Sequence, residues 1–160
     1  MSSDFGDECG RTPPVFSQDG ASRDTINNPT GTGLEVFVVF TDAFGTLAAL
    51  QLADGLAQEL EGHIRLLVPH EVPYALPLTK PAVSVEFLEG QVRNLIQNLR
   101  LDVAAEVCFC RDKRRTLESL LRPQSLVVVG GKQRWWPTSA QKLAQDLQKD
   151  GHRVIFAKLR

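Results

Sequence analysis

The chain has 160 residues, of which 42% are hydrophobic and 23% charged, and its formal net charge is −1. This length suits one domain, and the near-neutral charge excludes a general attraction to nucleic acid or to anionic membranes, so we expect neither as a partner. No apolar stretch is long enough to span a bilayer and the first residues do not form a secretion signal, which predicts a cytoplasmic protein. The three cysteines are too few and too unevenly spaced for a disulfide framework.

Residues 1–33 are predicted to form a flexible acidic tail. They are rich in glycine, proline and short polar residues, and they show neither a strand-like nor a helix-like apolar period. Five acidic and two basic residues give this tail a charge of −3, which leaves +2 for the rest of the chain. Residues 34–160 are predicted to form the folded domain.

From residue 34 onward, apolar runs typical of buried strands alternate with apolar residues at helical spacing. The runs predict strands over residues 36–40, 64–68, 103–110, 126–129 and 154–157. The helical spacing predicts helices over residues 47–60, 88–99, 117–121 and 140–147. Gly62 stands where a glycine often ends a helix, and Thr138 followed by Gln141 has the spacing of a capping box.

This alternation predicts an α/β fold with an open, mostly parallel five-stranded sheet and helices on both faces, because parallel neighbours need crossover connections. In such sheets, ligands bind at the carboxyl ends of the strands. The loops expected to carry chemistry are therefore those after Phe40, Val68, Cys110 and Val129.

Two of these loops contain candidate anion-binding or ligand-binding groups. Asp42 follows the first predicted strand and could accept hydrogen bonds from a ligand, or it could shape the turn and cap the helix. Gly130 and Gly131 end the fourth strand, and Lys132 and Arg134 make the next loop basic, so that backbone amides and cations could meet an anion there. A tight turn from strand to helix would also need the glycines.

Other unusual features lie in the same region. Trp135 and Trp136 are adjacent in a loop, where at least one could be an exposed anchor for a protein partner and the other could pack inward. A basic run follows the third strand and could bind phosphate or form a solvated surface; it consists of Arg111, Lys113, Arg114 and Arg115. Cys108 and Cys110 are predicted to be buried apolar side chains rather than metal ligands. No catalytic constellation is visible.

The segment Val36 to Asp42, the strand Leu66 to Val68, the run Leu126 to Gly131 and the closing strand Val154 to Ala157 resemble the universal stress protein family. The resemblance covers nearly all of the folded part. It implies a Rossmann-like fold of the adenine nucleotide alpha hydrolase type, with strand order 3-2-1-4-5 and a cleft between the first and fourth strands. It also implies a homodimer paired through the last strand.

In nucleotide-binding members of that family, an aspartate after the first strand and a valine at the second strand hold the adenosine. The resemblance places Asp42 and Val68 at these positions. Gly130 matches the first glycine of the family's phosphate loop, but Gln133 stands at the second. The third glycine has no counterpart, because the loop to Ser139 is short and contains two tryptophans and a proline, which has no amide hydrogen.

These observations predict a universal-stress-protein-like regulatory or interaction domain that catalyses no reaction and does not bind ATP in the family's usual mode. The alternative is a protein that binds a nucleotide or a small anion in the cleft between the first and fourth strands. The candidate binding residues are Asp42, Val68, Gly130, Gly131, Lys132, Arg134 and Ser139. We expect no metal and no cofactor. A third interpretation, nucleotide hydrolysis or transfer, has no visible acid–base pair to support it.

Overall fold

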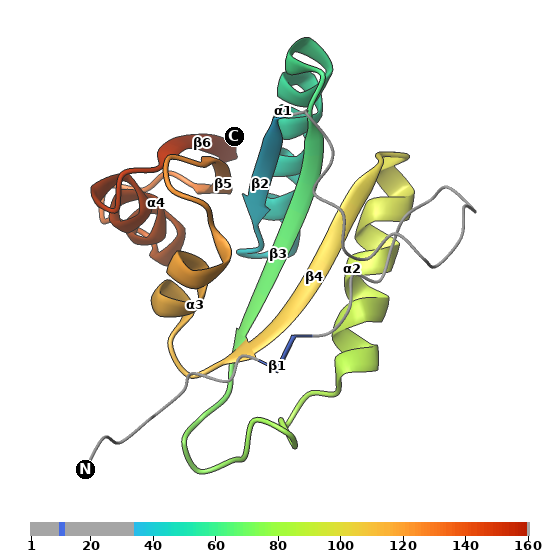
Figure 1. Cartoon of the computed structure of the whole chain (residues 1–160), viewed down its shortest axis with the longest axis vertical. Helices are drawn as coiled ribbons and strands as arrows, with labels where there is room; N and C mark the ends of the chain where they lie inside the picture. The colour runs from blue at the N-terminus through green and yellow to red at the C-terminus, as the bar shows by residue number, and fades with distance from the viewer. Residues whose placement is uncertain (1–9, 12–33, 160) are drawn as a thin grey trace.

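The structure is a computed structural model, and it describes residues 10–11 and 34–159 (Figure 1). From residue 34 onward its elements are β2 (Glu35–Val39), α1 (Ala43–Leu60), β3 (His63–Glu71), α2 (Val85–Leu99), β4 (Val103–Cys110), α3 (Lys113–Leu120), β5 (Leu126–Lys132), α4 (Ser139–Lys149) and β6 (Arg153–Leu159). Every strand and helix predicted for this region is present, and most extend beyond the predicted range. None of the helices in this part of the chain is long and apolar enough to cross a membrane.

Five strands form a parallel sheet in the order β4-β3-β2-β5-β6. Counted from residue 34, this is the predicted order 3-2-1-4-5, so the fold prediction is confirmed. The first and fourth of these strands, β2 and β5, are neighbours at the centre of the sheet and pair from Val36 with Leu126 to Val39 with Val129. Each neighbouring pair of strands is parallel, so the carboxyl ends of all five strands meet at one edge.

A two-residue strand, β1 (Gly10–Arg11), adds to the sheet beyond β4 and was not predicted from the sequence. It pairs antiparallel with β4, Gly10 with Phe109 and Arg11 with Cys108. Two residues are too few to show the apolar alternation by which a strand is recognised in a sequence, so this strand leaves no periodic signal. The rest of the predicted tail lies outside the described residues.

Helices cover both faces of the sheet, and alternate residues of each strand pack on opposite sides. Val36 and Val38 pack with the buried faces of α1 and α2, whereas Phe37 and Val39 pack with those of α3 and α4. Figure 1 shows α3 and α4 together on the side of β5 and β6. The central strands are therefore buried on both faces, which explains their continuous apolar runs.

The structure confirms one of the two predicted helix caps, the capping box at Thr138, and shows a different role for Gly62. Thr138 accepts a hydrogen bond from the Gln141 amide while the Gln141 side chain accepts one from the Thr138 amide, so the predicted capping box is confirmed. Gly62 does not provide the left-handed residue that ends α1, because Glu61 takes that conformation, with φ of 50°. A side chain at Gly62 would instead collide with the backbone of Leu34.

Candidate functional site

A pocket of about 620 Å³ opens at the carboxyl ends of the central strands, on the side of α3 and α4. This volume is in the range of small-molecule sites. Its lining comes from the ends of β2, β3 and β5, from the start of α3 and from the first two turns of α4: Phe40, Thr41, Asp42, Glu71, Asp112, Lys113, Arg114, Gly131, Lys132, Arg134, Thr138, Ser139, Ala140, Lys142, Leu143 and Asp146.

The pocket brings together most of the residues predicted from the sequence. The predicted residues that line it are Asp42, Gly131, Lys132, Arg134 and Ser139. Val68 and Gly130 do not line it. Val68 is buried in the core on the face covered by α1 and α2, which is the opposite face of the sheet from the pocket.

Gly130 allows α1 to lie close to the end of β5, because it has no side chain. A Cβ added at Gly130 would overlap the carbonyl oxygen of Gly45 and lie 2.6 Å from its carbonyl carbon. The Thr41 hydroxyl donates a hydrogen bond of 2.7 Å to the carbonyl oxygen of Gly130, which ties the end of β2 to the same point. The first glycine of the predicted phosphate loop is therefore required for packing, whether or not a ligand binds.

Three of the carboxylates around the pocket stabilise the starts of helices. Asp42 caps α1 by accepting a hydrogen bond of 2.8 Å from the Gly45 amide. At the start of α3, Asp112 accepts from the Arg115 amide and Glu71 accepts from the Lys113 amide. Of the two roles predicted for Asp42, its contacts support the helix cap, because the carboxylate already accepts a hydrogen bond from the backbone.

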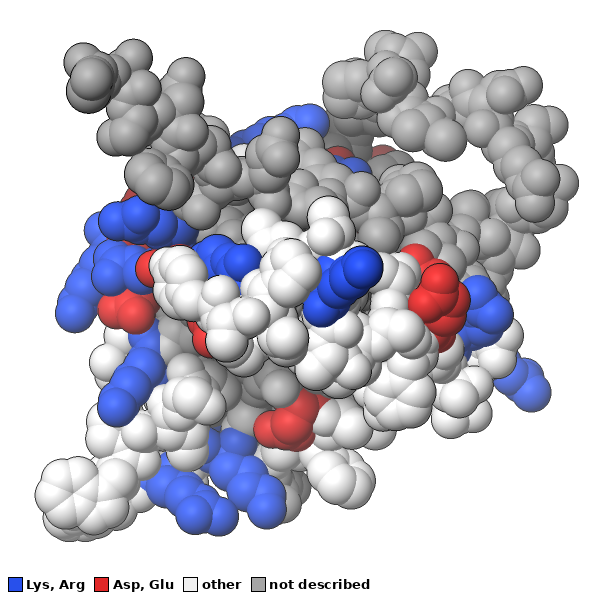
Figure 2. Space-filling view, turned by 90° about the horizontal axis from the view of Figure 1, so that it is seen from below, with Lys and Arg blue, Asp and Glu red and all other residues white. Residues whose placement is uncertain are grey.

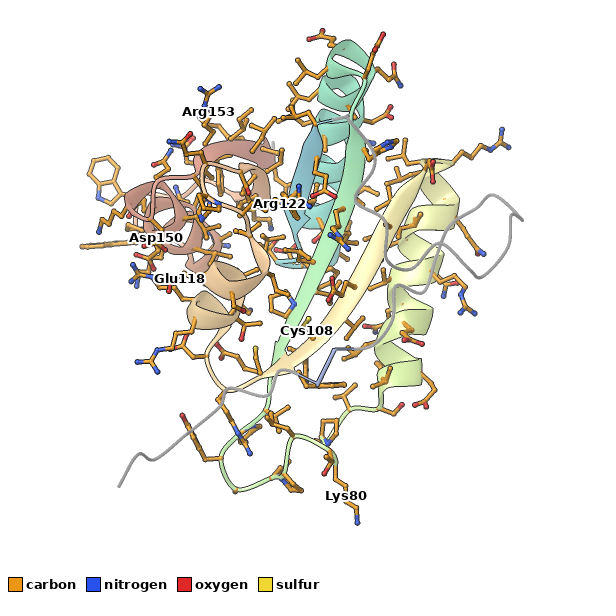
Figure 3. All side chains as sticks on the ribbon, viewed as in Figure 1. Lys80, Cys108, Glu118, Arg122, Asp150 and Arg153 are labelled. Atoms are coloured by element: carbon orange, nitrogen blue, oxygen red, sulfur yellow. The ribbon has the colours of Figure 1, made fainter. Side chains whose placement is uncertain are left out.

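Arg114 joins α3 to α4 through three carboxylates. Its guanidinium donates a hydrogen bond of 3.0 Å to Asp150 and lies 3.6 Å from Glu118 and 3.9 Å from Asp146. Figure 3 shows Glu118 and Asp150 near each other where α3 and α4 meet. The hydrogen bond and the charge of Asp150 raise the pKa of Arg114, and the hydrogen bond from Arg114 lowers the pKa of Asp150.

Four cationic side chains at the pocket have no such carboxylate partner. In the part of the chain that the structure describes, no ion pair involves the four cations Lys113, Lys132, Arg134 and Lys142. Seen from the carboxyl ends of β2 to β4, Lys and Arg gather mainly on one side of the molecule, with Asp and Glu among them (Figure 2). The pocket therefore has free positive charge for an anionic group, although carboxylates stand beside it.

The loop between β5 and α4 presents two tryptophans directly beside the pocket. Trp135 and Trp136 are 94% and 80% exposed, so both indoles are exposed and neither packs inward. They lie between Arg134 and Thr138, which both line the pocket. Pro137 and the capping box at Thr138 fix the backbone where the loop enters α4.

The basic run after β4 divides between two roles that sequence reasoning did not separate. Arg111 donates hydrogen bonds to the carbonyl oxygens of Val72 and Pro73 and lies over the ring of Tyr74, so it holds the loop that follows β3. Lys113 and Arg114 instead line the pocket. No local sequence signal marks this division, because it depends on which loops meet at the edge of the sheet.

The two cysteines of β4 are buried, as predicted, with exposed fractions of 1% and 3% for Cys108 and Cys110. The Cys110 thiol donates to the carbonyl oxygen of His70 at 3.7 Å. Within the described residues, no three His, Cys, Asp or Glu side chains are grouped so that they could hold a metal ion.

Neither a family model nor a curated protein matches this chain. The fold and the pocket define a broad class: a parallel α/β domain with a ligand-sized hollow where the carboxyl ends of its central strands meet.

Proposed function

We propose that this chain is a universal-stress-protein-like regulatory or interaction domain that binds a protein partner through the loop of Trp135 and Trp136 and catalyses no reaction. The exposure of the two adjacent indoles is the observation that carries this proposal. A buried aromatic anchor is the typical hot spot of a protein interface, and large exposed apolar side chains that cluster on a soluble protein mark interaction sites. Both indoles stand on a loop whose ends are fixed by β5 and α4.

The state of the helix amides supports the proposal that ATP is not bound in the family's usual mode. A phosphate loop binds through backbone N–H groups that are free at a helix start. Here the Gly45, Lys113 and Gln141 amides donate to side chains of the protein itself. These three amides already have acceptors, whereas the Ser139 and Ala140 amides of α4 remain open to a ligand, so a polyphosphate would find only part of the usual amide set, and Pro137 has no amide to add to it.

The roles of the carboxylates support the absence of catalysis. General acid–base chemistry needs a carboxylate or histidine directed at the substrate. Asp42, Asp112 and Glu71 accept hydrogen bonds from helix amides, and Asp146 lies beside Arg114. Each acidic side chain of the pocket therefore already caps a helix or lies beside an arginine of the chain itself.

A small anion in the pocket is the second candidate function, and the four cations without carboxylate partners favour it. Lys132 and Arg134 stand at the end of β5, next to the first turn of α4. Thermal-shift measurements with phosphate and pyrophosphate test it, since a ligand selective for the native state raises the melting temperature. The Lys132→Gln, Arg134→Gln variant should lose such a shift, whereas Asp42→Asn should retain it.

We further propose that the domain forms a homodimer through β6, the edge strand of the sheet. One side of β6 pairs with β5, and no strand of the described residues pairs with the other. An open edge of this kind invites pairing with a second chain. Val154, Ile155 and Phe156 on this strand are only partly buried, which leaves apolar surface for the contact.

The interaction proposal is tested by photo-crosslinking in cells. A benzophenone amino acid replaces Trp135 in one version of the chain and Phe87, an exposed side chain of α2, in the control. A discrete crosslinked adduct at position 135 that is absent at position 87 is the expected result. If position 135 gives no more adduct than position 87, the tryptophan loop is not the interaction surface.

A further inference from the structure

The tryptophan loop and the neighbouring cations form one surface, defined by Lys132, Arg134, Trp135, Trp136 and Lys142 and called here the loop surface. We propose that its partner is an extended acidic peptide segment of another protein, with carboxylates beside an apolar side chain. This inference rests on the proposed interaction function and specifies the chemistry of the partner.

The charge of the loop surface points to an acidic partner. Residues 130–138 contain two cations and no acidic residue. Lys132 and Arg134 are exposed and form no ion pair with any described residue. Lys142, in the first turn of α4, adds a third cation at the rim of the pocket. A carboxylate of a partner that docks here could form ion pairs with these cations, which form none with the described residues of the chain itself.

The acidic residues of the pocket argue against a continuous polyanion. Asp42, Glu71, Asp112 and Asp146 line the same pocket as the cations. The phosphates of a nucleic acid or the headgroups of an anionic membrane are evenly spread, so they would face these carboxylates as well as the cations. A peptide can place single carboxylates opposite single cations and avoid the like charges.

The indoles require an apolar group within the same ligand. Trp135 and Trp136 offer large rigid faces with little rotational freedom to lose on binding. Carboxylates alone would leave both indoles in water, with exposed fractions close to those of the free chain. An apolar or proline side chain packed on an indole removes this surface from water, and the cations of the same loop and of α4 can then pair with the carboxylates of the peptide.

The experiment selects the partner chemistry without presuming its sequence. A phage-displayed library of random peptides is selected on the wild-type chain, with counter-selection on the Trp135→Ala, Trp136→Ala variant. Because both side chains are solvent-exposed, that variant should keep its fold, and its melting temperature serves as the check. Selected peptides are then synthesised and titrated into the wild-type chain with intrinsic tryptophan fluorescence as the readout. The signal reports on the loop surface alone, since the chain has only two tryptophans.

The expected result is enrichment of peptides that combine Asp or Glu with an apolar residue. Replacing their acidic residues by Asn and Gln should weaken binding by about tenfold or more, and the Lys132→Gln, Arg134→Gln variant should bind the acidic form about tenfold more weakly. The control variant, Lys80→Gln with Lys149→Gln, removes the same charge from other parts of the surface and should bind normally.

Three results would overturn the inference. Enriched peptides without acidic residues would refute the acidic partner and leave the interaction function standing, since the photo-crosslinking at position 135 tests that separately. Failure to enrich any peptide would refute recognition of an extended peptide segment. Tighter binding of a single-stranded oligonucleotide or of phosphatidylserine vesicles than of every selected peptide would show that the surface recognises a polyanion instead.

Discussion

Replacing Gly130 by alanine should strongly destabilise the domain, because this glycine permits the close approach of α1 to β5. The added Cβ would overlap the Gly45 carbonyl oxygen and lie 3.1 Å from the Cβ of Ala49. The Gly45 atoms belong to the backbone of α1, so no side-chain rotation relieves the collision. Such overpacking costs about 3 kcal/mol, which for a chain of this size lowers the melting temperature by roughly 6–12 °C.

The matched control is Gly55→Ala, within α1 itself. A Cβ at Gly55 meets no atom within 4 Å, so the same substitution only removes backbone freedom from the unfolded chain. It should stabilise the domain by about 0.5–1 kcal/mol. Differential scanning calorimetry measures both variants. A Gly130→Ala variant that melts within a degree of the wild type would refute the packing role of this glycine.

Three further predictions concern the edge strand β6, the pair of Arg114 and Asp150, and residues 1–33. The Arg153 amide donates to Ser125 beside β5, so the amide of Lys158, an odd number of residues along β6, faces the open edge. Lys158→Pro should therefore convert a wild-type dimer into a folded monomer in light scattering at tens of micromolar, and a wild-type monomer would exclude β6 as the interface. The pKa of Asp150 is lowered by Arg114, so the stabilisation from this pair is complete above the unfolded pKa and is lost as the pH falls through the lower folded value. The melting temperature of Asp150→Asn should therefore lie below that of the wild type at pH 7, and the two should converge below about pH 4. Deletion of residues 1–33 should leave the melting temperature nearly unchanged, since the tail residues that the structure describes, Gly10 and Arg11, form only a two-residue strand with β4, and a drop of several degrees would contradict this.

The strands, the helices and the parallel sheet were predictable because the central strands and the helices each leave a clear apolar pattern, whereas the strand order was expected only from the resemblance to the universal stress protein family. The run of residues 103–110 predicts a strand with the observed bounds, since it is apolar apart from Glu106 and ends before Arg111. The extension of β3 to Glu71 could not be seen, because Pro69 and His70 interrupt the apolar run. These residues join the strand through pairing with β4, and the sequence does not encode that long-range contact locally.

The pocket was only partly predictable, for a similar reason. The carboxyl ends of parallel strands must meet, so Lys132 and Arg134 could be placed there from topology alone. Lys113 and Lys142 line the pocket only because of the way α3 and α4 pack on the sheet, and no residue spacing in the sequence indicates that packing. Conversely, Gly130 matched a binding motif although its contacts with α1 are those of a packing residue.

We propose that the loop after β5 acts through its exposed side chains rather than as a phosphate loop. The most direct test is a calorimetric titration of ATP with magnesium into the full chain. Because the Gly45, Lys113 and Gln141 amides already donate to side chains and Pro137 has no amide, we expect no saturable binding at micromolar concentrations and at most weak binding near millimolar. A micromolar dissociation constant that the Lys132→Gln, Arg134→Gln variant abolishes would contradict the claim and identify a nucleotide site.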